Sequence, residues 1–143
     1  MNVASILKVK GNDVITASPS DSIAAVSQVL GEKRIGAVLV VDTSQKLCGV
    51  LSERDIVRGL SEAGEGCLDL RATDLMTSDL VTTSPSETID NVMALMTEKR
   101  IRHLPVLEDG KLAGFISIGD VVKCRMDEVE REAAALRDYI ATG

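Results

Sequence analysis

Hydrophobic positions recur along the chain in two similar blocks. The block at 14–42 is matched by the block at 80–108, at an offset of roughly 66 residues. The two blocks share polar positions as well, because Thr16-x-Ser18-Pro19-Ser20 recurs as Thr82-x-Ser84-Pro85-Ser86. A repeat of this length is a whole supersecondary unit, so the sequence predicts two copies of one fold.

Within each block the apolar spacing changes from that of a strand to that of a helix and back. In the first copy, 14–16 is predicted to be a short strand, and 37–41 and 47–51 form two strands joined by a polar turn. A second helix is expected from about Glu53, and in the second copy from about Gly119. The buried faces of the first helices are expected to consist of Ile23, Val26, Val29 and Leu30, and of Ile89, Val92, Leu95 and Met96. Each copy therefore reads strand, helix, strand, strand, helix.

Polar residues and short apolar runs suggest where these elements begin. Ser18-x-x-Asp21 and Ser84-x-x-Glu87 fit capping boxes, so we expect a helix to start at or within a residue or two of each. A short apolar helix is expected before each copy. The predicted divisions are 1–61 for the first repeat, 62–70 for a linker, 71–125 for the second repeat and 126–143 for a C-terminal helix.

The C-terminal segment has a pattern of its own. Six apolar residues are spaced 4, 3, 4, 3 and 4 apart, as in a coiled-coil heptad seam. Two interpretations remain open: an amphipathic helix folded back on its own domain, or a helix that pairs with a partner chain. We favour a contribution to a dimer. The seam consists of Val122, Met126, Val129, Ala133, Leu136 and Ile140.

Composition and charge narrow the possible partners. The net charge is −6, which disfavours general affinity for nucleic acid. The chain has one Phe, one Tyr and no Trp, so bases cannot be held by stacking on several rings. Basic residues gather locally at Lys33-Arg34 and at 99–103, where they could bind a small phosphate ligand or simply offset a helix dipole.

Other features argue against catalysis and against membrane insertion. The chain has a single histidine, His103, and lacks a P-loop or a nucleophile elbow, so we expect neither an enzyme nor a metal site. The three cysteines are widely spaced, as expected of reduced thiols, and Cys48 is predicted to be a small core residue. No apolar run reaches membrane-spanning length and no leader pattern is seen, so a soluble, cytoplasmic protein is expected.

The residues best suited to ligand chemistry occur once in each copy. A strand ends at Ser52 or Ser117, a helix begins there, and Asp55 or Asp120 follows three residues later. The first turn of a helix attracts phosphate through its free N–H groups and the helix dipole. A carboxylate nearby can accept hydrogen bonds from ribose hydroxyls. The same Ser-x-x-Asp pattern is also a capping box that needs no ligand, and both interpretations stay open.

The duplicated chain resembles a tandem of cystathionine-β-synthase (CBS) domains, also called a Bateman module, over about residues 1–125. The chain is similar to small stand-alone bacterial proteins of this family, in which no enzyme or channel domain is fused to the pair. The resemblance implies an α+β fold in which two pseudo-symmetric βαββα repeats pack together through their sheets, with the C-terminal amphipathic helix added. The residues that carry the resemblance are Asp74, Met76 and Thr77, the run 100–106, and the two Gly-x-x-Ser-x-x-Asp motifs that start at Gly49 and Gly114.

The resemblance also implies two clefts between the repeats, each able to hold an adenine nucleotide. In that family the motif Ser contacts phosphate, the Asp contacts ribose, and the base packs on the first strand and the start of the second. Nearby arginines are candidate phosphate partners here through charge-assisted hydrogen bonds. Carried over to this sequence, the first site would consist of Ile15, Thr16, Arg34, Gly36, Ala37, Ser52, Arg54 and Asp55. The second would consist of Val81, Thr82, Arg100, Arg102, His103, Leu104, Pro105, Ser117 and Asp120.

The two copies differ where the ligand would bind. Glu53-Arg54 in the first corresponds to Ile118-Gly119 in the second, and Leu39 stands where the second has Pro105. The two sites should therefore differ in affinity or ligand. The leading hypothesis is a non-catalytic homodimeric sensor that binds AMP, ADP, ATP or NAD, or else S-adenosylmethionine, and signals to an unidentified regulated protein. The alternative is a structural dimerisation module with vestigial sites. Neither hypothesis involves nucleic acid or a membrane.

Overall fold

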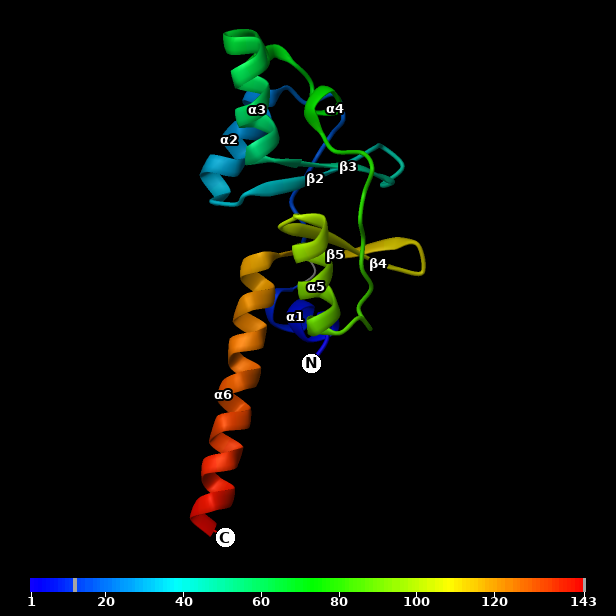
Figure 1. Ribbon diagram of the computed structural model, residues 1–143. Coiled ribbons are helices and arrows are strands. Elements are labelled where there is room, and N and C mark those ends of the chain that lie inside the picture. Colours follow the sequence, from blue (N-terminus) through cyan, green and yellow to red (C-terminus); the bar gives the residue numbers. More distant parts are fainter. Residues whose placement is uncertain (12, 143) are drawn as a thin grey trace. The chain divides into compact units, whose positions relative to one another are not determined.

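The computed structural model describes residues 1–11 and 13–142, which fall into two compact units. Unit 2 is the continuous segment Val14–Val81, and unit 1 combines Met1–Asp13 with Thr82–Gly143. The short helix at the start of the chain is thus grouped with the second repeat in sequence. The fold is mixed α and β with two separate sheets and a long C-terminal helix, as the α+β class predicted (Figure 1).

Unit 2 contains a three-stranded sheet in the order β1-β2-β3. β1 (Thr16–Ala17) runs parallel to β2 (Ala37–Val41), and β2 pairs antiparallel with β3 (Leu47–Ser52). Helix α2 (Ile23–Lys33) connects the first two strands and α3 (Glu53–Ala63) follows the third. A 3₁₀ helix, η1 (Gly64–Asp69), and the short α4 (Ala72–Leu75) complete the unit.

The core of unit 2 follows the predicted helix stripe. Ile23, Val26 and Leu30 are buried on α2, and Val29 packs against them while partly exposed. Every residue of β2 is buried. The segment expected to be a linker, 62–70, contains η1 and places Cys67 in this core with no exposed surface. Cys48, expected in the core, is only half-buried at its edge.

Unit 1 repeats the arrangement with a two-stranded sheet. β4 (His103–Glu108) pairs antiparallel with β5 (Lys111–Ser117), and a single parallel bridge from Thr83 to Val106 stands where unit 2 has β1. The hairpin turn places Asp109 and Gly110 at positive φ, the conformation that a tight two-residue turn requires. α5 (Ile89–Lys99) buries Ile89, Val92 and Met96, as its apolar spacing predicted.

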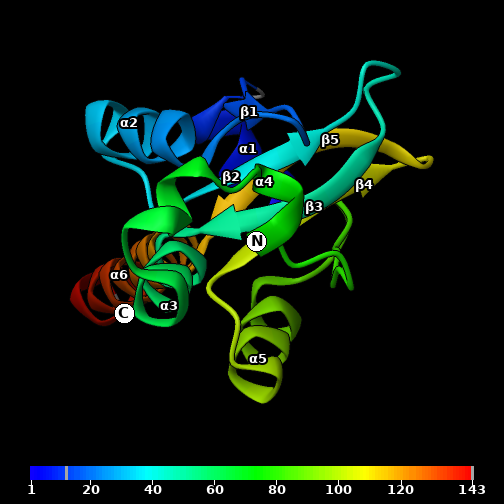
Figure 2. The same ribbon diagram turned by 90° about the horizontal axis from the view of Figure 1, so that it is seen from above.

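Two other helices complete unit 1. α1 (Val3–Lys10) is tied to the loop before α5 by backbone bonds from Val3 to Glu87 (2.9 Å) and from Ala4 to Pro85 (2.9 Å). α6 (Ile118–Thr142) is one continuous helix, because after Gly119 no Gly or Pro interrupts it before its end. Turning the molecule by 90° shows α6 end-on (Figure 2). The expected separation of 71–125 from 126–143 therefore corresponds to no break in this helix.

Two local expectations were wrong. The helices begin at Ile23 and Ile89 with Ser22 and Thr88 as N-caps, four residues after the predicted Ser18 and Ser84. The physical reason is that the Ser-Pro segments turn before the helices start, and the Asp21 carboxylate accepts the Ser18 N–H (2.9 Å) within that turn. The first strand lies at Thr16–Ala17, two residues after its predicted start, because these two residues pair with Leu39 and Val40.

Candidate functional site

Each unit has the expected Ser and Asp where its last strand meets the following helix. In unit 2, Ser52 ends β3 and is the N-cap of α3, and in unit 1 Ser117 ends β5 directly before α6. The carboxylate oxygen Oδ2 of Asp55 accepts the Ser52 N–H (2.9 Å), and that of Asp120 accepts the Ser117 N–H (2.8 Å). In return each Ser hydroxyl accepts the backbone N–H of its Asp, at 3.3 and 3.2 Å. Both motifs are thus formed capping boxes.

Some of the hydrogen-bonding groups at each helix start, which a ligand could otherwise use, already have partners within the protein. The first helical N–H groups are taken by loop carbonyls, since Glu53 donates to Gly36 (2.9 Å) and Ile118 to Arg102 (2.8 Å). The N–H of Arg54, and that of Gly119 in unit 1, have no acceptor among the described residues. Fewer first-turn N–H groups are therefore free to bind an anion than the sequence suggested, although the helix dipole remains. The Ser52 hydroxyl is also engaged, because it donates to Oδ2 of Asp55 (3.0 Å).

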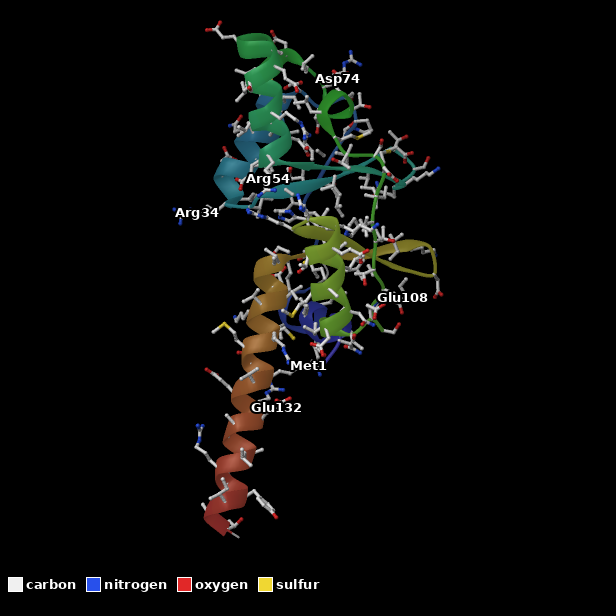
Figure 3. All side chains as sticks on the ribbon, in the orientation of Figure 1. Met1, Arg34, Arg54, Asp74, Glu108 and Glu132 are labelled. Atoms are coloured by element: carbon white, nitrogen blue, oxygen red, sulfur yellow. The ribbon has the colours of Figure 1, made fainter. Side chains whose placement is uncertain are left out.

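In unit 2 the structure brings most of the predicted first-site residues together. Ala37 pairs directly with Ser52 across the hairpin, and the Gly36 carbonyl accepts the first N–H of α3. Thr16 on β1 pairs with Leu39, two residues after Ala37 on β2. Arg34 is the left-handed C-cap of α2, with φ of 55°, and Arg54 lies exposed in the first turn of α3. Figure 3 labels both arginines at this end of the two helices. Ile15 lies just before β1 and is 37% exposed.

In unit 1 the second-site residues are arranged in the same way, with one exception. His103 pairs with Ser117 across the β4–β5 hairpin, and its ring lies 5.6 Å from that of Phe115. Leu104 and Pro105 are buried in β4, and the Pro105 carbonyl accepts the N–H of Thr83, next to Thr82. Arg100 is the left-handed C-cap of α5, matching Arg34, and Arg102 lies exposed before β4. Val81 is the exception, because it is the last residue of unit 2.

The two aspartates have different cationic partners, and sequence reasoning missed both. Asp55 is 6% exposed and its Oδ1 accepts from the Arg58 guanidinium (2.6 Å) one helical turn later. Asp120 is bonded instead by Lys10, whose ammonium lies 2.7 Å from Oδ2 and 2.8 Å from the Phe115 carbonyl. The Asp55-x-x-Arg58 spacing could have indicated the first pair. Nothing local could have indicated the second, which spans 110 residues.

The Lys10 contact sets the charge of Asp120. Partial burial alone would raise the pKa of this carboxyl group, but the hydrogen bonds from Lys10 and Ser117 and the positive charge of Lys10 outweigh it. The pKa of Asp120 therefore lies below its ordinary value, and the group is ionised at neutral pH. A cavity of about 230 Å³ adjoins this pair, lined among others by Ile6, Lys123 and Cys124. Burial, with the nearby charge of Glu128, raises the pKa of the Cys124 thiol.

Comparison with known proteins identifies the family. The CBS domain model matches the chain twice, at residues 6–62 and 72–127. The chain belongs to the CBS domain family. Among curated proteins it is 31% identical to the mitochondrial CBS domain-containing protein CBSX3 of Arabidopsis thaliana, over 99% of this chain and 72% of that protein.

Two solved structures of CBS proteins are relevant to the site. The CBS-domain protein ATU1752 from Agrobacterium tumefaciens is 41% identical with a TM-score of 0.85, covering 87% of this chain and 92% of that one. The CBS domain pair of protein MJ0100 was solved in complex with 5′-methylthioadenosine and S-adenosyl-L-methionine. It is 25% identical with a TM-score of 0.77, covering 87% of this chain and 98% of that one. The family thus includes a pair that binds adenosine-type ligands.

Other kinds of site are not found among the residues described. No helix within 1–11 and 13–142 is long and apolar enough to cross a membrane. Within the same ranges, no group of three or more His, Cys, Asp or Glu side chains is placed to hold a metal ion. The duplicated Ser and Asp pairs therefore remain the candidate site on which a functional argument can be built.

Proposed function

We propose that this CBS domain protein is a non-catalytic regulatory module that binds an adenine nucleotide at its two Ser-x-x-Asp helix starts. AMP, ADP, ATP or NAD is the proposed ligand, with S-adenosylmethionine as a further candidate. The observation that carries the proposal is the same pairing of an Asp carboxylate with a Ser at a strand-to-helix junction in both units. The adenosine-type ligands of MJ0100 support the choice of ligand class.

The proposed roles follow the chemistry of each group. Ser52 and Ser117 bind phosphate with the aid of the helix dipole and the remaining N–H groups of Arg54 and Gly119. Asp55 and Asp120 accept hydrogen bonds from the two ribose hydroxyls. The arginines proposed as additional phosphate ligands, through charge-assisted hydrogen bonds, are Arg34, Arg54, Arg100 and Arg102.

The remaining residues are proposed to surround the base. They lie on or beside the strands next to each Ser and include the start of β2 and of β4. In the first site they are Ile15, Thr16, Gly36 and Ala37. In the second they are Val81, Thr82, His103, Leu104 and Pro105.

The two sites are proposed to bind with different affinities. At both sites a cation already bonds the Asp, but its origin differs. At the second site the ligand must compete with Lys10, which comes from α1, for Asp120. At the first site the competing cation is Arg58, from the same helix as Asp55. The regulatory step then consists of a change of conformation that favours or disfavours an unidentified partner protein. Such a shift requires only that the ligand bind one conformation more tightly than the other.

A thermal-shift panel tests this function directly. The purified chain is heated with millimolar AMP, ADP, ATP, NAD or S-adenosylmethionine, with GMP as the matched control for phosphate and ribose. A ligand present at a hundred times its dissociation constant stabilises the fold by about 2.7 kcal/mol, which raises Tm by several degrees. A shift with adenine ligands and none with GMP is expected. No shift with any adenine ligand would contradict the proposal.

A second candidate function is a structural dimerisation module. It is favoured by the apolar seam on α6, of which Met126, Leu136 and Ile140 are respectively 61, 59 and 69% exposed. Truncation after Asp127 separates the two functions. A truncated chain that is monomeric but still shifts with nucleotide assigns sensing to the two units and assembly to the helix.

A further inference from the structure

The C-terminal part of α6 carries an apolar face that the described residues of its own chain, 1–11 and 13–142, leave largely uncovered. The start of the helix is packed, since Val121 has no exposed surface, but Val122 and Val129 are 43 and 49% exposed and Met126, Leu136 and Ile140 are more so. Figure 1 shows the red end of α6 extending beyond α1 and α5 of the same unit. The seam runs from Val122 to Ile140, about 28 Å of helix at 1.5 Å per residue.

The spacing of the seam assigns every residue of this helix to a heptad position. Because the first step is four residues, Val122, Val129 and Leu136 occupy position d, and Met126, Ala133 and Ile140 occupy position a. The positions flanking the seam follow directly. Position g holds Arg125, Glu132 and Tyr139, and position e holds Lys123, Glu130 and Arg137.

The flanking charges distinguish the two ways in which a second copy could pair. In a parallel dimer, each g residue faces the e residue five positions later on the other helix. Arg125 would then face Glu130 of the second copy, and Glu132 would face Arg137 of the second copy. Both contacts join opposite charges.

An antiparallel dimer centred on the same seam pairs g with g and e with e. Glu132 would then face Glu132, Glu130 would face Glu130, and Lys123 would face Arg137. All three contacts join like charges. Like charges placed opposite one another suppress the wrong arrangement.

We propose that α6 forms a parallel two-stranded coiled coil with α6 of a second copy of this chain, in register along this seam. This inference deepens the second candidate function and does not depend on nucleotide binding. The short seam and the small Ala133 at position a make the contact weak, so the assembly should dissociate on dilution.

Glu132 and Arg137 are the pair on which the test rests. Neither makes an ion pair within the described residues, whereas Arg125 is already bonded to Glu128 (3.2 Å) in its own helix. Figure 3 shows Glu132 on the extended part of α6. In a single helix Glu132 lies four residues after Glu128, a like-charge spacing that E132R would relieve. Loss of association in E132R would therefore not come from loss of helix.

Sedimentation analysis of the full chain over a range of concentrations provides the test. The symmetric dimer contains the Glu132–Arg137 contact twice, and E132R or R137E makes both copies of this contact repulsive, so each variant should weaken association about tenfold. An equimolar mixture of the two variants restores opposite charges at both contacts and should associate as tightly as wild type, within about twofold. D138R, at outward position f, makes the same change of charge and should leave association unchanged.

Each contrary result overturns the proposal. A wild-type chain that stays monomeric at hundreds of micromolar shows that the seam does not pair with a second copy. Variants that associate like wild type place the interface elsewhere. A mixture that associates no better than either variant alone excludes the parallel arrangement.

Discussion

The glycines that open the two Gly-x-x-Ser-x-x-Asp motifs make a matched pair of positions for mutation. Gly49 lies on β3 and Gly114 on β5, and neither has a positive φ, so backbone strain does not decide their identity. A Cβ added at Gly49 would lie 2.9 Å from the backbone carbonyl oxygen of Thr77 and 2.7 Å from the Met76 sulfur. One added at Gly114 would meet only the Leu7 side chain, at 2.5 Å from Cδ2.

The two contacts differ in how easily they yield. The Thr77 carbonyl is fixed by a pair of backbone bonds with Val50, at 3.0 and 2.9 Å, so G49A must displace backbone and weaken these bonds. Overpacking of this kind costs about 1–3 kcal/mol. At Gly114 the methyl end of Leu7 can rotate away. Ala also has a lower chain entropy than Gly in the unfolded state, which stabilises the variant by about 0.4–1 kcal/mol and offsets part of the remaining packing cost. We expect G49A to cost about 2 kcal/mol and G114A less than about 1 kcal/mol.

Urea unfolding of the two variants and wild type measures the difference. With similar m-values, G49A should shift the midpoint clearly downward and lower Tm by about 4–8 °C, and G114A by about half of that or less. Equal costs for the two variants would contradict the reasoning, because they would show that the Thr77 backbone yields as readily as a side chain. An unperturbed G49A would show that the close approach of Met76 and Thr77 to β3 does not exist.

Three further predictions concern individual side chains. K10M removes the cation that binds Asp120 and should lower the free energy of unfolding by roughly 1 kcal/mol at pH 7. Because the folded pKa of Asp120 is depressed, this stability is present above its unfolded pKa of about 4 and is lost as pH falls through the folded value, so the K10M and wild-type urea midpoints should converge in acid. Ellman's reagent should modify fully buried Cys67 more slowly than half-buried Cys124 in the native chain; equal rates would refute the packing of η1. L51A, at a side chain with no exposed surface, should cost about 2–5 kcal/mol by calorimetry, and a loss below 1 kcal/mol would contradict its place in the core.

The sequence predicted those parts of the fold that local pattern controls. The helix stripes on α2 and α5 and the two hairpins follow from apolar spacing, and the tight turn at Asp109-Gly110 follows from turn chemistry. The predicted helix starts at the Ser-Pro segments were wrong. Ser18 and Ser84 have the spacing of a capping box, but they belong to the turn that precedes each helix.

The parts that depend on distant packing could not be predicted in this way. The apolar positions of α1 indicate a helix but not which repeat it packs against, and its placement beside the second repeat brings Lys10 to Asp120. The candidate site shows the same division. Ser52 with Asp55 was predictable from a motif that is local, whereas the cation at the second aspartate depends on a contact across 110 residues.

Calorimetric titration with AMP tests the central claim most directly, using wild type, the double variant D55N/D120N and the control D74N. Asp→Asn keeps a capping oxygen but removes the charge that would bind ribose, and hydrogen bonds to charged groups are worth about 1.5–3 kcal/mol. Asp74 caps α4 in the same way, accepting the Arg71 N–H at 2.8 Å, but lies outside the Ser-x-x-Asp motif and is labelled in Figure 3. The account predicts saturable binding to wild type and D74N, weakened at least tenfold in D55N/D120N. AMP binding of equal strength in all three proteins would contradict it, as would a wild type that binds none of AMP, ADP, ATP, NAD and S-adenosylmethionine.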